Sequence, residues 1–325
     1  MKLLILGDST ATALLSQYVP IGKLLGKEYT IDYYACSPVN LQLAYHMPFI
    51  NYVLCGKVSG KTNELDYIEP SEGFKYGVQK YFYDADVNIS EVKVSQRFFN
   101  KIEEYDKILI LYDGEFYPIL WLIREVFSRY EHKCIGRFGD WNKDMAQRNL
   151  QKYIPKEAVE SLGFQWDDNL LKLEYDWYKE FDTKIPYKKN SLFLQCSAGC
   201  ESFMPYHDWQ TFFPCGKLGN FLRKQGFDVI LSNRREDIRR QLFNLKANYV
   251  LFIDSITLWL GKAFSSKYMF CYSCPCEINS IQIGYDTIIG EKYSNLHQLT
   301  PELILEVFLE SLKKEGCPLR GKYLI

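Results

Sequence analysis

The chain has 325 residues, of which 47% are hydrophobic and 24% charged, and its 39 Lys and Arg nearly cancel its 40 Asp and Glu. A domain holds roughly 150 residues, so the length predicts about two domains, and the composition excludes a disordered chain. Balanced charge argues against a protein that coats nucleic acid or an anionic membrane surface. No segment reaches the roughly 18 apolar residues of a membrane span, and the apolar run before Gly7 is too short for a secretion signal. We therefore expect a cytoplasmic protein with reduced cysteines.

The first half of the chain alternates short apolar runs with segments of helical spacing. Residues 2–6 form a buried-type run that ends at Gly7, and residues 107–112 form the clearest strand, followed by a turn at Asp113. Strand, turn, helix and strand in this order are typical of a parallel sheet with crossover helices. Further strands are expected at 29–36, 50–55 and 132–135, and helices at 9–25, 41–47 and 116–130.

Two stretches interrupt this alternation. Residues 56–100 are polar, acidic and rich in Tyr and Phe, and we interpret them as an insertion that lies over the sheet. Residues 141–189 hold two short predicted helices and a charged stretch that contains Trp. The run 183–190 is the best candidate for a linker between domains. The predicted domains are residues 1–185 and 186–325.

The second half repeats the same pattern, ending with a helix that starts at Thr300-Pro301, a favourable N-cap and first helical residue, and runs to about Lys314. We therefore predict an α/β protein made of two Rossmann-like lobes, with parallel sheets and crossover helices, that face a cleft. Strands are expected at 191–196, 227–231, 249–254 and 268–272, and helices at 216–226, 236–248 and 255–264.

Ligands of open parallel sheets bind beyond the carboxyl ends of the strands, where helix N-termini offer unpaired N–H donors. Four polar turns follow predicted strands, two in each lobe. An Asp or Ser at such a junction is typical of a simple N-cap when taken alone. The joint placement of the four turns favours a binding site. They are Gly7-Asp8-Ser9-Thr10, Asp113-Gly114-Glu115, Cys196-Ser197-Ala198-Gly199 and Asp254-Ser255.

The Gly7-Asp8-Ser9 turn also resembles the nucleophile turn of the SGNH esterases, with Ser9 as the nucleophile. Such an esterase needs a histidine base with an aspartate three residues before it. The chain has 4 histidines, and the residues three positions before them are Leu43, Arg129, Met204 and Ser294. An Asp-x-x-His pair is thus missing, and the esterase is the weaker alternative.

Short segments in both halves match one family better. In the first half they are Gly7-Asp8, the helix with Pro20, Ile31-Asp32, the segment 48–53, Tyr105-Asp106 with the strand and Gly114 that follow, and Ile135-Gly136. In the second half they are the strand 192–196, the loop 197–199, His207-Asp208-Trp209, and the segment 254–259. With these motifs the chain resembles the heptosyltransferase-like inverting glycosyltransferases of GT-B fold (glycosyltransferase family nine). The resemblance covers most of the chain apart from 56–100 and 141–189.

This resemblance implies transfer of a heptose-like sugar or a hexose from a nucleoside-diphosphate-sugar to an acceptor hydroxyl, with inversion. It makes Asp8 the general base and places Gly7 and Asp113 on the acceptor side. The acceptor would be a saccharide, a lipid-linked saccharide or a protein, and a nucleic acid is not expected. No cofactor is required. The implied donor-binding residues are Ser197, His207, Arg234, Asp254, Ser255 and Thr257.

Three residues depart from the family pattern. His207 stands where the family has a lysine, Ile256 replaces a glycine, and Trp259 replaces a histidine. These changes leave open a second interpretation, in which the chain is a non-catalytic relative that acts as a binding or assembly component. Preferred binding of one nucleoside diphosphate separates the enzyme from this alternative.

A cysteine cluster at Cys271, Cys274 and Cys276 is the candidate metal site, and Cys196, Cys200 and Cys215 in the same lobe are further candidate ligands. Thiolates at such spacing can hold structural zinc or iron. The spacing is not that of a zinc ribbon, and cysteine also packs as a small apolar residue in protein cores. Both interpretations stay open from the sequence, and buried reduced thiols are the favoured one.

Overall fold

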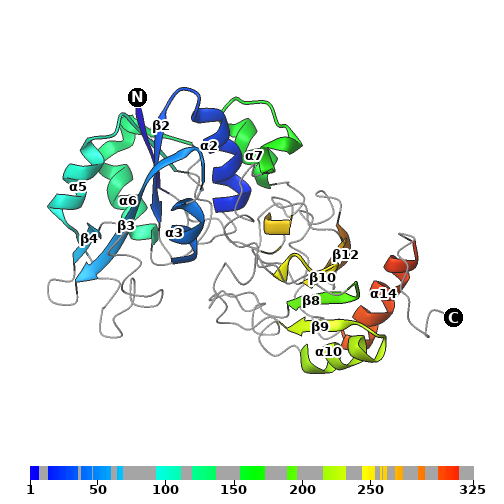
Figure 1. The fold of residues 1–325 in the computed structure, drawn as a ribbon. Coiled ribbons are helices and arrows are strands. Elements are labelled where there is room, and N and C mark those ends of the chain that lie inside the picture. Colours follow the sequence, from blue (N-terminus) through cyan, green and yellow to red (C-terminus); the bar gives the residue numbers. More distant parts are fainter. Residues whose placement is uncertain are drawn as a thin grey trace. The chain divides into compact units, whose positions relative to one another are not determined.

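The computed structural model describes residues 1–6, 14–35, 38–45, 47–59, 64–68, 93–110, 119–136, 154–172, 189–195, 215–231, 244–252, 257, 259–261, 268–273, 285–289 and 299–314. The chain divides into two compact units, of which the first is Met1–Arg148 with Ile154–Trp177 and the second is Asn149–Tyr153 with Tyr178–Ile325. Each unit is built on a sheet of mainly parallel strands with helices between them, which confirms the predicted α/β fold class (Figure 1).

The sheet of the first unit has its first strand near the centre. Its strand order is β5-β4-β3-β2-β1-β6-β7. All pairs are parallel except β3 and β4, which run antiparallel. The strands are β1 (Lys2–Leu6), β2 (Thr30–Ala35), β3 (Ile50–Ser59), β4 (Glu64–Ile68), β5 (Lys93–Val94), β6 (Lys107–Leu109) and β7 (Cys134–Ile135).

The interpretation of residues 56–100 as an insertion over the sheet is wrong for their described parts. Strand β3 runs on to Ser59, and β4 and β5 extend the same sheet at its edge. Leu65 and Tyr67 alternate with Glu64 and Asp66, so both apolar side chains reach one face and join the core beside α5 (Gln96–Glu103). Because polar residues alternate with the apolar ones, the composition of this segment did not indicate a strand.

Helices cover both faces of this sheet. On one face, α5 and α6 (Ile119–Tyr130) pack on a core cluster that includes Leu4 and Leu6, whereas Leu3 and Ile5 point the other way and are equally buried. Two-sided burial explains why β1 is apolar throughout instead of alternating. The remaining helical segments are the π-helical turn Leu14–Tyr18, α2 (Val19–Leu25), α3 (Pro38–Tyr45), the 3-10 turn Glu131–Lys133, α7 (Ile154–Ser161) and the 3-10 turn Asp168–Leu171.

The second unit has a fully parallel sheet in the order β12-β11-β10-β8-β9. Helices α10 (Cys215–Lys224) and α14 (Pro301–Lys314) lie against an aromatic core on one face. Helix α14 starts at Pro301 as predicted, and the Thr300 hydroxyl caps it by accepting a hydrogen bond from the Leu303 N–H at 3.2 Å. The strands are β8 (Ser191–Gln195), β9 (Asp228–Leu231), β10 (Tyr249–Phe252), β11 (Tyr268–Ser273) and β12 (Asp286–Ile289), of which the last was not predicted.

The expectation that all cysteines are reduced is wrong for Cys215, which is disulfide-bonded at the first turn of α10. Cys55, Cys134 and Cys271 are free. Burial raises the pKa of Cys55 to about 12 and that of Cys134 to about 11, so both thiols stay protonated at neutral pH. Protonated, desolvated thiols are poor nucleophiles and poor metal ligands.

The disulfide predicts a redox-dependent stability. A native disulfide typically contributes about 2–4 kcal/mol by restricting the unfolded chain, so dithiothreitol should lower the unfolding midpoint of the wild-type protein in urea. Cys215→Ser should start at the reduced midpoint and show no further response to the reductant. Cys134→Ser is the control and should keep the full response, because Cys134 is free. A wild-type midpoint that ignores the reductant would contradict the disulfide.

Candidate functional site

The first sheet has a topological switch point between β1 and β6, where the connections from neighbouring strands leave in opposite directions. After β1 the chain turns to β2 on one side, and after β6 it continues to β7 on the other. Ile5 pairs with Leu109, so the carboxyl ends of the two strands are level. Ligands of open α/β sheets bind at such points. The turn that begins with Gly7-Asp8 therefore leaves from the strand end that the topology favours.

Hydrogen bonds clamp the opposite end of β1. The Asp106 carboxylate accepts a hydrogen bond from the Lys2 N–H at 2.7 Å, and the Asp106 N–H donates to the Lys2 carbonyl at 3.0 Å. The pair joins the amino ends of β1 and β6. Since β1 has only five residues, a clamp at its start also fixes where it ends.

A buried carboxylate links β2 to its neighbours. Asp32 is 8% exposed and accepts hydrogen bonds from the Tyr105 hydroxyl at 2.9 Å and from the Asn51 side-chain amide at 3.0 Å. Burial, and then the charge of Asp32, raise the pKa of Tyr105 above its ordinary value, so the hydroxyl remains a donor. Two motifs of the sequence, Ile31-Asp32 and Tyr105-Asp106, thus join β2 to β3 and to the start of β6, and the start of β6 to β1.

The second sheet has the same arrangement between β8 and β10. After β8 the chain goes through α10 to β9 on one side, and after β10 it goes to β11 on the other. Gln195 pairs with Phe252, so these strand ends are also level. The Tyr272 hydroxyl donates to the Gln195 carbonyl at 3.0 Å, and burial raises the pKa of Tyr272 well above 10. The turns that begin at Cys196 and at residue 253 therefore leave from neighbouring positions.

A helical turn follows β10 and carries two residues singled out in the sequence. Thr257 is 1% exposed and Trp259 is 3% exposed. A Cβ on Gly261 would lie 2.1 Å from the Met269 sulfur, so the turn packs closely on β11 and a larger residue would require the Met269 side chain to move. Within the described ranges, the Trp259 indole Nε1–H is buried and makes no hydrogen bond.

Most predicted site residues lie outside the described ranges, and their roles stay predictions. Thr257 and Cys271 are described, and Cys271 is fully buried in β11. The residues that the structure describes contain no group of three or more His, Cys, Asp or Glu able to hold a metal ion. The predicted residues outside these ranges are Gly7, Asp8, Ser9, Asp113, Ser197, His207, Arg234, Asp254, Ser255, Ile256, Cys274 and Cys276.

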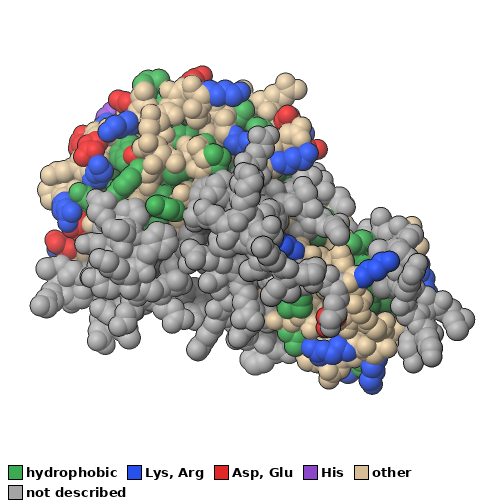
Figure 2. Space-filling view, viewed as in Figure 1, with side chains coloured by type: hydrophobic (Ala, Val, Ile, Leu, Met, Phe, Trp, Pro, Cys, Tyr) green, Lys and Arg blue, Asp and Glu red, His purple; other side chains and the backbone are tan. Residues whose placement is uncertain are grey.

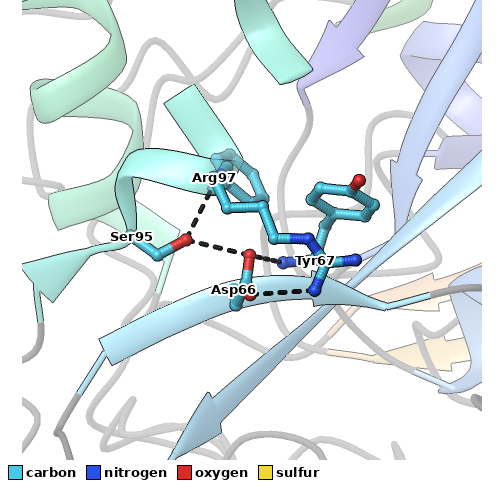
Figure 3. Close-up of polar contacts among 5 residues, drawn as sticks. Asp66, Tyr67, Ser95 and Arg97 are labelled. Atoms are coloured by element: carbon cyan, nitrogen blue, oxygen red, sulfur yellow. Dashed lines mark hydrogen bonds and ion pairs between the residues drawn. The ribbon is translucent and has the colours of Figure 1, made fainter. Parts of the chain in front are cut away.

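One polar cluster, at the edge of the first sheet, was missed by sequence reasoning. Asp66 accepts hydrogen bonds from the Tyr67 N–H and the Ser95 hydroxyl, both at 2.9 Å, and Arg97 lies 3.3 Å from its second oxygen (Figure 3). The guanidinium is 4.4 Å from the centre of the Tyr67 ring, and Ser95 also caps α5 through the Phe98 N–H. The side chains are partnered within the cluster, so it fastens β4 to α5. The N-cap serine before an apolar pair was the signal available in the sequence.

Comparison with known proteins supports the fold. No protein-family model matches the chain, and no curated protein matches it in sequence. Among solved structures it is similar to the E. coli ADP-heptose lipopolysaccharide heptosyltransferase II, with 13% identity, a TM-score of 0.52, and coverage of 97% of this chain and 100% of the other.

It is similar also to E. coli heptosyltransferase WaaC with ADP, with 12% identity, a TM-score of 0.52 and coverage of 98% and 99% of the two chains. The WaaC structure with ADP-2-deoxy-2-fluoro heptose matches with 13% identity, a TM-score of 0.50 and coverage of 96% and 99%. The resemblance stated from the sequence is therefore confirmed at the level of the fold.

Removing the Tyr105 hydroxyl tests its hydrogen bond to Asp32. Tyr105→Phe leaves a buried carboxylate with one donor fewer, and we expect the free energy of unfolding to fall by about 1–3 kcal/mol. Urea denaturation of the purified protein measures this. Tyr29→Phe is the matched control, since no hydrogen bond of its hydroxyl occurs within the described ranges and the residue is only partly buried. Equal stability of the two variants would show that the hydrogen bond from Tyr105 to Asp32 does not stabilise the fold.

The edge cluster makes a separate prediction. Ser95→Ala removes the N-cap of α5 and one hydrogen bond to Asp66, and should lower the free energy of unfolding by about 1 kcal/mol or somewhat more. Ser128→Ala is the control, because Ser128 is exposed within α6 and bonds only its own helix at the Glu125 carbonyl. Hydrogen exchange of the α5 amides gives a local measurement. Unchanged protection in α5 would show that the cap is not needed.

Proposed function

We propose that the chain is an inverting glycosyltransferase that uses a nucleoside-diphosphate-sugar donor. The observation that carries the proposal is the pairing of topology with sequence. In each unit the level strand ends at the switch point precede the polar turns singled out from the sequence. The similar E. coli structures, which cover nearly the whole chain, include WaaC with ADP and with an ADP-sugar analogue.

The donor is assigned to the second unit. Helix N-termini and neutral or cationic donors can stabilise a diphosphate without a metal as it gains charge on leaving. In this proposal Asp254 holds ribose hydroxyl or loop N–H groups, since a carboxylate repels phosphate. No cofactor is required. The proposed donor contacts are Ser197, His207, Arg234, Ser255 and Thr257.

The acceptor is assigned to the first unit. In the proposed reaction an acceptor hydroxyl oxygen bonds to the anomeric carbon, and the bond from that carbon to the diphosphate oxygen breaks with its electron pair leaving on the diphosphate. Asp8 takes the hydroxyl proton, because an aspartate with a pKa of about 4 is ionised at neutral pH and can act as a base when it touches that hydroxyl. Gly7 and Asp113 belong to the same acceptor side.

The acceptor class is a saccharide, free or carried on a lipid or a protein. Basic and acidic side chains are interspersed on the face of the first unit that Figure 2 displays. Arg97, Lys101 and Lys133 each lie within 4 Å of a carboxylate. Such a mixture gives no single-signed field of the kind that draws in nucleic acid. No helix in the described ranges combines the length and apolar character that a membrane span needs.

The alternative is a relative that binds a ligand without transferring a sugar. Two observations favour it: Ile256 stands at a position where glycine is expected from the motif, and Trp259 fills a buried position with a large ring. A turnover assay distinguishes the transferase from the binding component. A binding or assembly component shows no preferred thermal stabilisation by one nucleoside diphosphate, and it releases none from a nucleoside-diphosphate-sugar in the presence of saccharide acceptors.

Asp8→Ala is expected to lower nucleoside diphosphate release from ADP-heptose or UDP-glucose by about 100-fold to 10,000-fold, the usual contribution of a general base. Affinity for ADP or UDP, measured by calorimetry, should stay unchanged. Glu28→Ala removes an exposed carboxylate from the same unit and should keep full turnover. Near wild-type turnover in the Asp8 variant would remove the proposed base, and labelling of Ser9 by a fluorophosphonate would favour the esterase instead.

A further inference from the structure

The disulfide of Cys215 ties the first residue of α10 to another part of the chain. Its partner is not among the other described cysteines, because Cys55, Cys134 and Cys271 are free. A disulfide needs Cα atoms about 4.4–6.8 Å apart, so the packing of α10 selects among the rest. The remaining cysteines are Cys36, Cys196, Cys200, Cys274, Cys276 and Cys317.

The start of α10 lies at the carboxyl edge of the second sheet. At the opposite end of the helix, the Asp228 N–H donates to the Asn190 carbonyl at 3.0 Å, so the helix ends beside the start of β8. A Cβ on Gly219 would lie 3.7 Å from the Leu194 side chain. The helical turn from Gly219 back to Cys215 covers about 6 Å, and two strand residues beyond Leu194 cover about 7 Å. Cys215 is therefore level with the residues that follow β8.

The cysteine near the C-terminus is too far from this position. Helix α14 begins beside the start of α10, where Lys217 pairs with Glu302 at 2.6 Å, and it runs to the amino edge of the sheet, where Ser311 bonds the Tyr268 hydroxyl. Its 14 residues span about 21 Å. Cys317 comes three residues after the helix, and three residues reach at most about 11 Å. The return to α10 is longer than that.

The connection between β8 and α10 supplies the best partner. Helix α10 rests on β8 and β9, whereas β11, which precedes Cys274 and Cys276, is separated from β8 by β10. Cys36 follows a strand of the other compact unit. Packed layers lie about 10 Å apart. Cys196 directly follows the strand and stays in the sheet layer, but four further residues, up to about 14 Å of chain, bring Cys200 within reach of the helix.

We propose that Cys215 is bonded to Cys200, and that this disulfide holds the donor-binding loop in a redox-dependent way. The bond closes residues 201–214, which include His207, into a loop. It also holds the segment of Ser197 from both sides, because the Gln195 carbonyl before it is already fixed by the Tyr272 hydroxyl. A loop ordered beforehand binds its ligand at lower entropic cost. The pairing stands by itself, whereas the regulation rests on the proposed function.

The reductant in this switch is a dithiol. Thiolate attack breaks the bond between the Cys200 and Cys215 sulfurs, which take up two electrons and two protons as thiols, while the dithiol is oxidised to a disulfide. Reduction then releases the loop at its α10 end. The reduced protein has to order residues 201–214 when the donor binds, so its affinity for the donor is lower.

Peptide mapping of the wild-type protein tests the pairing. Free thiols are alkylated with iodoacetamide, and the unreduced protein is then digested with trypsin and with endoproteinase Glu-C, which cuts after Glu201 and so separates Cys200 from Cys215. We expect the peptide that ends at Glu201 to be linked to the peptide of Cys215 and to carry the alkyl label on Cys196. A label on Cys200, or a link to any other cysteine, overturns the pairing.

Calorimetric titration with ADP, UDP, GDP and CDP in each redox state tests the regulation. We expect the Kd of the preferred nucleotide to rise about 10-fold when dithiothreitol reduces the wild-type protein. Cys200→Ser should bind as weakly as the reduced protein and ignore the reductant, whereas the matched variant Cys196→Ser should keep the wild-type response. An unchanged wild-type Kd overturns the regulation and leaves the proposed function standing. Absence of binding by all four nucleotides in both states overturns the function and the regulation together.

Discussion

The first unit depends on one buried charge. A carboxylate that is 8% exposed is costly unless donors surround it, and Asp32 obtains them from Tyr105 and Asn51. A one-residue slip of β2 against β1 would turn Asp32 to the opposite face and break both bonds. The carboxylate therefore fixes the register in which Asp32 pairs with Leu4. Together with the Asp106–Lys2 clamp, it determines where β1 ends and the Gly7-Asp8 turn begins.

In the second unit, apolar packing fixes the positions of the strands. Its central strands carry buried side chains on both faces, and the aromatic rings of Phe227, Tyr249, Phe270 and Phe308 pack against one another with centroids 5.3–5.8 Å apart in the contacting pairs. The Tyr272 hydroxyl ties the end of β8, and the close approach of Gly261 to Met269 fixes the turn after β10. Steric fit leaves little freedom here, because cores are packed at near-crystal density. Among the described residues of this unit, the strand ends are held by the Tyr272 hydroxyl bond and by steric fit.

Strands that are apolar throughout could be predicted from the sequence. Strands β1, β6, β8 and β10 were found because runs buried on both faces are continuous in sequence. The strand order was not predictable in detail, since pairing joins distant segments; Tyr105 and Asp32 are 73 residues apart. Strands β4 and β12 were missed because polar residues alternate with apolar ones in β4, and β12 opens with the polar pair Asp286-Thr287. The bond of Cys215 was missed because a disulfide depends on which distant cysteine the fold brings near.

The motifs that carry the resemblance divide into two physical classes. Asp32, Tyr105 and Asp106 are fixed by hydrogen bonds inside the first unit, so any sequence that keeps this sheet is under pressure to keep them or their equivalents. In proteins of this class, residues in loops at strand ends generally vary more than residues of the sheet, because most loops can change without disturbing the core. At 12–13% identity the similarity to the E. coli structures lies in the fold. The departures at His207, Ile256 and Trp259 all lie in segments that follow strands of the second sheet.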